Sequence, residues 1–241
     1  MKTCLAGEKT PESRFMPEID PAQVPRAAAA LIARYGAWPD ESSGPVLDQL
    51  VWFLLSTRTT VENCEAAYSA LRAELPSWAA VAEAPEESLH APLRPSGLFR
   101  SRARNLKSLL GILRERFGQV SLEALRGWQD AECEAFLLTL PGVGLKVARC
   151  VMSFGLGRRA FAVDAHIWRV TRRLGWHSFP GEAPTRAGAD AIQELALLCD
   201  DPLSFHVDLI RLGRELCPSG EPDCPPCPLA RQCAYARARK A

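Results

Sequence analysis

Four cysteines lie within seventeen residues near the end of the chain, at Cys217, Cys224, Cys227 and Cys233. Their spacing, C-x6-C-x2-C-x5-C, and the prolines between them are typical of a loop that wraps a metal centre. A metal bound by four thiolates fixes the path of such a loop, so this feature constrains the fold more than any other in the sequence. The spacing suits both a Cys4 zinc site and an iron–sulfur cluster, and it does not by itself decide between them.

The remaining cysteines argue against a disulfide framework. They are odd in number and irregularly placed, at Cys4, Cys64, Cys133, Cys150 and Cys199. Residues 1–10 also lack the apolar core of a secretory signal. We therefore expect a cytoplasmic protein in which Cys133, Cys150 and Cys199, on apolar helix faces, are buried thiols.

Helical periodicity covers most of the chain, with glycine or proline between the segments. The predicted helices are residues 28–35, 46–56, 61–75, 78–83, 85–91, 101–117, 122–128, 132–140, 145–154, 165–174, 185–198 and 202–216. Strand-type alternation is scarce, and no apolar run approaches the roughly 18 residues that span a bilayer. The sequence predicts a soluble, all-α protein with no membrane partner.

Two short segments carry much of the positive charge of a chain whose formal net charge is only +1. Residues 94–116 contain seven arginines or lysines and one acid, and residues 146–173 contain the same numbers. One positive face that grips a phosphate backbone would explain both segments. Helix surfaces that expose arginines to solvent are the alternative.

A glycine-rich turn joins two of the predicted helices, with the sequence LPGVGLK at residues 140–146. Gly142 and Gly144 bracket Val143, so the turn can adopt positive φ and no side chain blocks close approach. The N–H groups of this turn and of the next helix then face outward at a positive helix end, which suits a phosphate. An ordinary glycine-capped corner between two helices is the alternative.

Lys146 and Asp164 are the candidate chemical groups near this turn. Lys146 follows the turn directly, where burial and the positive helix end favour the neutral amine that a nucleophile needs. Asp164 precedes the helix predicted at 165–174, so it can cap that helix or present a carboxylate to a reaction centre near Lys146.

Taken together, these motifs resemble the endonuclease III family of helix–hairpin–helix DNA glycosylases. Residues 140–148 (LPGVGLKVA) are similar to its hairpin with the catalytic lysine, and residues 163–166 (VDAH) to its catalytic aspartate motif. The eighteen-residue separation of Lys146 and Asp164 is also that of the family. Residues 54–60 (LLSTRTT) and 97–105 (GLFRSRARN) resemble its two segments that enter the DNA stack.

The resemblance runs from about residue 28 to 235 and implies a fold and a cofactor. Residues 39–158 would form a six-helix domain with the hairpin, and residues 21–38 and 159–241 a cluster domain. Residues 1–20 would be a flexible tail, as their Pro, Glu, Lys and Ser content also suggests. The four clustered cysteines would hold a [4Fe–4S] cluster, and double-stranded DNA would lie between the domains.

The resemblance also implies an activity. A damaged base would be flipped out of the duplex while Arg58 and Leu98 fill the gap, and Gly142, Val143 and Gly144 hold the backbone. Lys146 would attack the sugar and form a Schiff base, assisted by Asp164. The expected protein is therefore a monomeric, nucleoid-associated base-excision-repair DNA glycosylase with AP lyase activity. Its substrates would be damaged bases, expected to be oxidised pyrimidines, and abasic sites.

Two other functions stay open at this stage. One is a weakly catalytic or non-catalytic binder of damaged or distorted DNA on the same scaffold, and the other is a zinc-bearing interaction module. The sequence also departs from the family. It has Arg58 in place of the usual glutamine and Val61 in place of a polar residue, and both changes bear on which bases are accepted. Glu221 and Asp223 replace the basic residues usual in the first cysteine loop, so weak DNA contact is expected there.

Overall fold

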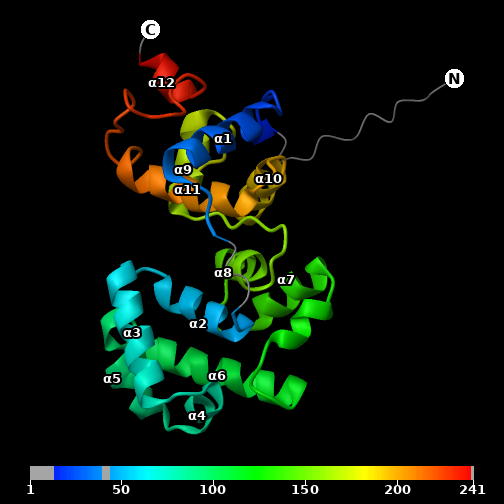
Figure 1. Cartoon of the computed structure of the whole chain (residues 1–241), viewed down its shortest axis with the longest axis vertical. Helices are drawn as coiled ribbons and strands as arrows, with labels where there is room; N and C mark the ends of the chain where they lie inside the picture. Colours follow the sequence, from blue (N-terminus) through cyan, green and yellow to red (C-terminus); the bar gives the residue numbers. More distant parts are fainter. Residues whose placement is uncertain (1–13, 40–43, 240–241) are drawn as a thin grey trace, which may run out of the picture. The chain divides into compact units, whose positions relative to one another are not determined.

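The computed structural model describes residues 14–39 and 44–239. Every regular element within these ranges is helical and no strand occurs in them, so the all-α prediction is confirmed (Figure 1). Across the same ranges, no helix combines the length and apolar character that a membrane span requires.

The chain divides into two compact units. Unit 1 comprises Met1–Pro39 and Phe161–Ala241, and unit 2 comprises Asp40–Ala160. Figure 1 draws unit 2 mainly in cyan and green, and unit 1 in blue and in yellow to red. Within the expected flexible tail, residues 1–13 lie outside the described residues, whereas Phe15 stacks 5.1 Å from the ring of Phe179.

Unit 2 is built around two helices, α2 (Val46–Ser56) and α6 (Phe99–Phe117). Their apolar faces are buried together with those of their neighbours in one core. The other elements are α3 (Val61–Glu74), α4 (Trp78–Glu83), η2 (Glu86–Leu89), α5 (His90–Leu93), η3 (Arg94–Ser96), η4 (Glu123–Gly127), α7 (Asp130–Thr139), α8 (Leu145–Cys150) and η5 (Val151–Gly155). The last of these is a π-helical continuation of α8.

Local signals explain where several of these helices begin and end. Thr60 and Ser77 cap α3 and α4 by accepting hydrogen bonds from the N–H groups of Asn63 and Ala80. Gly118 ends α6 with a left-handed φ of 71°. Thr60 also closes the loop between α2 and α3, which contains the candidate DNA-contacting residue Arg58.

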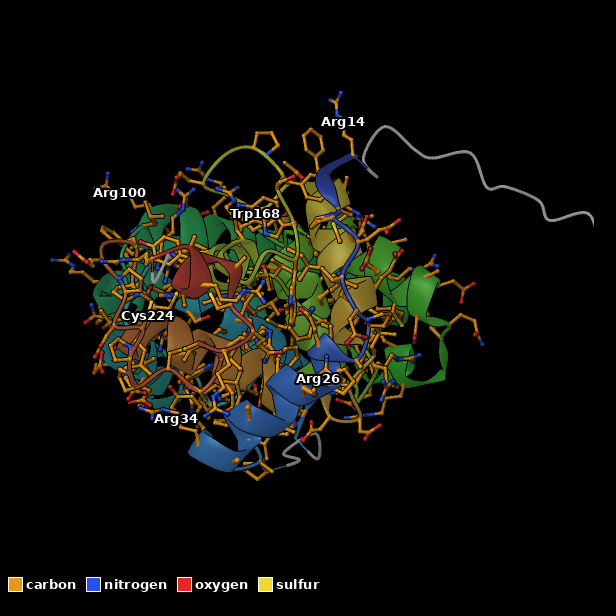
Figure 2. The ribbon with its side chains drawn as sticks, turned by 90° about the horizontal axis from the view of Figure 1, so that it is seen from above. Arg14, Arg26, Arg34, Arg100, Trp168 and Cys224 are labelled. Carbon is orange, nitrogen blue, oxygen red and sulfur yellow. The ribbon has the colours of Figure 1, made fainter. Side chains whose placement is uncertain are left out.

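Unit 1 packs α11 (Pro202–Glu215) against both α1 (Gln23–Tyr35) and α9 (Ala165–Leu174). It also contains α10 (Arg186–Ala196) and α12 (Ala234–Ala238). Trp168 and Trp176 are buried in this unit, and Figure 2 labels Trp168. Cys133, Cys150 and Cys199 are buried thiols in their units, which confirms that expectation.

Candidate active site, DNA-contacting loops and cysteine loop

The hairpin between α7 and α8 is a type II turn. Val143 N–H donates to Leu140 O at 3.1 Å, with Pro141 second and Gly142 third in the turn. Gly142 has φ of 82°, the value that a type II turn demands at this position. Gly144 is extended at φ −97°, so only Gly142 needs the conformational freedom of glycine.

Directly after this turn, the start of α8 offers unpaired backbone donors. The first hydrogen bond into the helix is donated by Ala148 N–H to Gly144 O. The N–H groups of Leu145, Lys146 and Val147 precede it, at the positive end of the helix. A methyl group built on Gly144 meets nothing within 4 Å, so an anion can approach this backbone closely.

Lys146 lies in the first turn of α8 and is half-buried. Its neighbours Val147 and Ala148 are buried in the core of unit 2, which anchors the helix and holds the lysine in place. No hydrogen bond or ion pair to the Lys146 amine occurs within the described part of unit 2. The amine is therefore available for chemistry with a bound molecule.

Asp164 caps α9 through one of its two oxygens. Its Oδ1 accepts a hydrogen bond from Ile167 N–H at 2.9 Å. Phe161, Ala162 and Val163 are buried before it and fix the backbone. Oδ2 has no hydrogen-bond partner among the described residues of unit 1, so the cap leaves one carboxylate oxygen for another role.

His166 lies beside Asp164 on α9 and is held by its own network. Its Nδ1 is 3.1 Å from Arg169 Nη2, which also donates to Gly213 O at 2.8 Å. Burial lowers the pKa of His166 below its usual range, and the nearby Asp164 charge opposes that effect. Burial thus favours the neutral form of His166 beside Asp164.

Arg58 and Leu98 have unusual backbone conformations. Within the described residues, they are the only non-glycine residues with positive φ, 55° for Arg58 and 49° for Leu98. Each such residue costs about 1–2 kcal/mol relative to ordinary backbone. Leu98 is also 60% exposed, although it is a large apolar residue. Strain at the two residues expected to enter DNA indicates that the fold holds both in place.

The two loops that carry these residues are called here the insertion loops, residues 57–60 between α2 and α3 and residues 97–98 before α6. Arg102 on α6 contacts both. Its guanidinium donates to Thr57 O at 2.6 Å and Ser96 O at 3.2 Å through Nη2, and to Gly97 O at 2.8 Å through Nε. In the sequence, Arg102 is one of seven basic residues in the segment 94–116, and nothing in its spacing shows this role.

A small cavity of about 120 Å³ connects the insertion loops to the hairpin within unit 2. Leu98, Arg102, Asn105 and Gly142 are among the residues that line it. A Cβ atom at Gly142 would be 2.8 Å from Asn105 Nδ2, so the hairpin packs directly on α6. The structure therefore brings together Leu98 and the hairpin glycine, which lie far apart in sequence.

Many side chains of the two basic segments turn toward their own chain. Lys107 donates to the carbonyls of Ala82 and Ala84, and Arg114 pairs with Glu83. In the second segment the protein partners are Glu134 for Arg149, Asp130 for Arg158, Phe179 O for Arg172 and Pro218 O for Arg173. Arg100, by contrast, points away from the ribbon (Figure 2). The sequence count therefore overstates the positive charge that faces outward.

The four clustered cysteines lie in one half-buried loop of unit 1. Burial raises the pKa of the Cys227 and Cys233 thiols, and charge repulsion from Cys217 and Cys224 raises both further. Arg173 Nη1 lies 3.2 Å from Cys217 Sγ and 2.7 Å from Pro218 O, so it braces the first part of the loop. Four thiols in one half-buried loop are the donor set that a structural metal centre uses.

The spacing of these side chains bears on the kind of metal centre. Within residues 14–39 and 44–239, no three His, Cys, Asp or Glu side chains are arranged to hold one metal ion. A single tetrahedral zinc with Zn–S bonds of about 2.3 Å would need sulfurs about 3.8 Å apart. The described side chains are therefore not preformed around a single metal ion.

Comparison with known proteins defines the class first. Residues 51–192 match the family described as "HhH-GPD superfamily base excision DNA repair protein". A hairpin with Gly142 and Gly144, followed by a helix with Lys146 in its first turn, lies inside the matched range. The fold and the site therefore define a helix–hairpin–helix DNA repair protein.

Individual relatives narrow the class. The chain is 31% identical over 192 residues to endonuclease III of Thermotoga maritima, covering 79% of this chain and 83% of that one. A putative DNA glycosylase of Arabidopsis thaliana is 37% identical over 131 residues, covering 54% of this chain; the match spans only 45% of that protein's length. A solved structure described as a trapped endonuclease III–DNA covalent intermediate is 25% identical with a TM-score of 0.75, covering 93% and 100% of the two chains. The chain belongs to the endonuclease III family.

Proposed function

We propose that this protein is a DNA glycosylase with AP lyase activity, in which Lys146 is the nucleophile and Asp164 its carboxylate partner. The observation that carries the proposal is the position of Lys146. It stands in the first turn of α8, directly behind a hairpin with open backbone donors, and it has no partner of its own in the described part of unit 2. A lysine in this position lies within reach of a sugar whose phosphate the hairpin binds.

The proposed reaction begins at the sugar. The Lys146 Nζ lone pair attacks C1′, and the electrons of the N-glycosidic bond leave with the damaged base. Opening of the sugar ring gives a protonated Schiff base, and loss of a C2′ proton then expels the 3′ phosphate and nicks the strand. Asp164, through Oδ2, would stabilise the positive charge that develops on the sugar. A base-excising enzyme without strand scission needs no such lysine.

Arg58 and Leu98 are proposed to fill the gap that the flipped nucleotide leaves. Both are held at strained backbone positions, and Leu98 already exposes an apolar side chain that a base stack would cover. The substrate class, oxidised pyrimidines and abasic sites in duplex DNA, rests on the family motifs. Arg58 and Val61 are the residues expected to adjust it. We further propose that the protein acts as a monomer at the nucleoid.

Cys217, Cys224, Cys227 and Cys233 are proposed to hold a [4Fe–4S] cluster. When bound, it supplies four iron–thiolate bonds that close the loop after α11. The Arg173 guanidinium donates hydrogen bonds to this loop at Cys217 Sγ, Pro218 O and Gly220 O. Removal of the thiolates is expected to loosen this loop while leaving Lys146, which lies in the other unit, unchanged.

Borohydride trapping tests the proposed function. Wild-type protein is incubated with a duplex that contains one abasic site, with and without borohydride, and covalent adducts are separated by denaturing electrophoresis. We expect an adduct with wild type, none with Lys146→Ala, and a strongly reduced yield with Asp164→Asn. If wild type forms no adduct but binds the same duplex, the protein is a non-catalytic binder of damaged DNA. A panel of duplexes with oxidised pyrimidines then defines the bases excised.

A further inference from the structure

One guanidinium connects the two insertion loops. Three of the Arg102 hydrogen bonds, at 2.6 to 3.2 Å, reach the carbonyls of Thr57, Ser96 and Gly97. Arg102 Nη1 also donates to Leu54 O and lies 3.3 Å from Thr57 Oγ1. The side chain thus makes five hydrogen bonds, as many as a guanidinium has N–H groups.

Two of these carbonyls have a particular place in the chain. Thr57 O is the carbonyl oxygen of the peptide group that joins Thr57 to Arg58. Gly97 O is likewise the carbonyl oxygen of the peptide group that joins Gly97 to Leu98. The orientation of each peptide plane sets the φ angle of the residue after it. Arg102 therefore holds the two peptide planes that define the positive φ values of 55° and 49° at Arg58 and Leu98.

The partners of Arg102 are unusual for a half-buried cation. No carboxylate pairs with it among the described residues, and all its acceptors are backbone carbonyls or one hydroxyl. Burial lowers the pKa of Arg102, and the charge of the nearby Cys64 opposes this effect. A planar guanidinium presents five donors in a fixed fork and can serve the carbonyls of two loops at once, whereas a lysine ammonium offers three donors at a single point. This arrangement suits the positioning of two loops better than simple charge pairing.

We propose that Arg102 is a positioning residue that locks both insertion loops together, so that Arg58 and Leu98 enter the base stack as one rigid unit. The inference rests on the proposed function, because it assigns Arg102 a task in opening the duplex. Arg102 itself does not touch the reacting sugar. Its loss should affect substrates that need a base pair opened and spare substrates that do not.

Lys107 offers a matched control on the same helix. It also donates to backbone carbonyls, those of Ala82 and Ala84, but these lie at the end of α4 and not in the insertion loops. A Lys107→Gln variant removes a half-buried cation and its carbonyl bonds without touching Arg58 or Leu98. An effect that Lys107→Gln shares with a substitution of Arg102 therefore reports on stability alone.

The experiment compares wild type, Arg102→Gln, Arg102→Lys and Lys107→Gln. Single-turnover trapping is measured on an abasic site in single-stranded DNA, which needs no insertion, and on a damaged base in a duplex. We expect both Arg102 variants to react about 10- to 100-fold more slowly on the duplex base, with single-strand rates near wild type. Lys107→Gln should behave like wild type on both. Equal losses of rate on both substrates would overturn the proposal, and so would an Arg102→Lys variant that reacts as fast as wild type.

A second readout is independent of catalysis. A duplex with a reduced abasic analogue carries 2-aminopurine in the opposite strand, and its fluorescence rises when the base is unstacked by insertion. Wild type and Lys107→Gln should give the full rise at saturating protein, and both Arg102 variants a smaller one. If no variant traps any abasic site, the proposed function fails, yet this fluorescence still decides whether Arg102 acts on insertion. A full rise with Arg102→Gln would refute its role.

Discussion

Replacing Gly142 by alanine tests how the hairpin is built. Gly142 has φ of 82°, so alanine there adopts a left-handed conformation at a cost of about 1 kcal/mol. Its Cβ would also lie 2.8 Å from Asn105 Nδ2 and 3.5 Å from Asn105 Cβ. Because Asn105 must move its amide end to make room, we add about another 1 kcal/mol for this close approach. The expected loss of stability is about 2 kcal/mol.

Two other glycines of unit 2 separate these contributions. Gly118→Ala has the same kind of strain, at φ of 71°, but its Cβ meets nothing within 4 Å, so about 1 kcal/mol is expected. Gly144→Ala has neither strain nor a close neighbour, at φ −97°, so it should not destabilise the protein. It does place a methyl group at the proposed phosphate site.

Thermal unfolding measures the loss of stability, and a DNA-binding assay measures the effect on the proposed phosphate site. In thermal scans, about 2 kcal/mol corresponds to roughly 4–8 °C for a chain of this size. Fluorescence anisotropy on a duplex with an abasic analogue should show weaker binding for Gly142→Ala and Gly144→Ala, and wild-type binding for Gly118→Ala. If Gly142→Ala is no less stable than Gly118→Ala and binds DNA as wild type does, the close packing of the hairpin on Asn105 has no consequence and the reasoning is wrong.

Three further predictions concern unit 1. Burial raises the pKa of Asp208 to about 6, above its unfolded value, so the stability it contributes is present in acid and is lost as the pH rises through 6. Asp208→Asn should therefore stabilise the protein at pH 8, by up to about 3 kcal/mol, and change little at pH 4; thermal unfolding that shows an equal gain at both pH values would contradict this. Replacing Glu221 and Asp223 by lysine should tighten DNA binding and steepen its salt dependence. The slope of log K against log salt concentration should change by about −0.9 for each additional phosphate that the lysines neutralise. A salt titration in which affinity does not improve would count against a repulsive loop. Purified protein should be brown and contain iron, and Cys227→Ser should be colourless with a protease-sensitive C-terminal loop; zinc without iron in wild type would refute the cluster.

Helix periodicity predicted most of the architecture because buried faces repeat along amphipathic helices. Apolar spacing placed helices at 61–75 and 101–117, and the structure has them at Val61–Glu74 and Phe99–Phe117. The prediction was less complete where the signal was short. Helix α12 was missed because five residues after Cys233 carry no periodic pattern. Helix α1 begins at Gln23, earlier than predicted. Pro25 does not prevent this start, because it lies in the first turn, where a backbone N–H has no partner within the helix.

The candidate site was predictable only in part. Turn chemistry indicated Gly142, and the residues after the turn indicated Lys146, since both signals are local in sequence. The positive φ of Arg58 and Leu98 was not predictable, because residue type opposes it and tertiary contacts impose it. Arg102 was invisible as a positioning residue for the same reason, since its partners lie on loops remote in sequence.

The chain offers a direct test of the central claim because it contains so few lysines, namely Lys2, Lys9, Lys107, Lys146 and Lys240. Wild-type protein is trapped on abasic duplex DNA with borohydride, the DNA is digested, and the modified peptide is identified by mass spectrometry. We predict that the reduced sugar remnant lies on Lys146. A remnant on one of the other four lysines or on the N-terminal amine, with Lys146 unmodified, would contradict the assignment of the nucleophile.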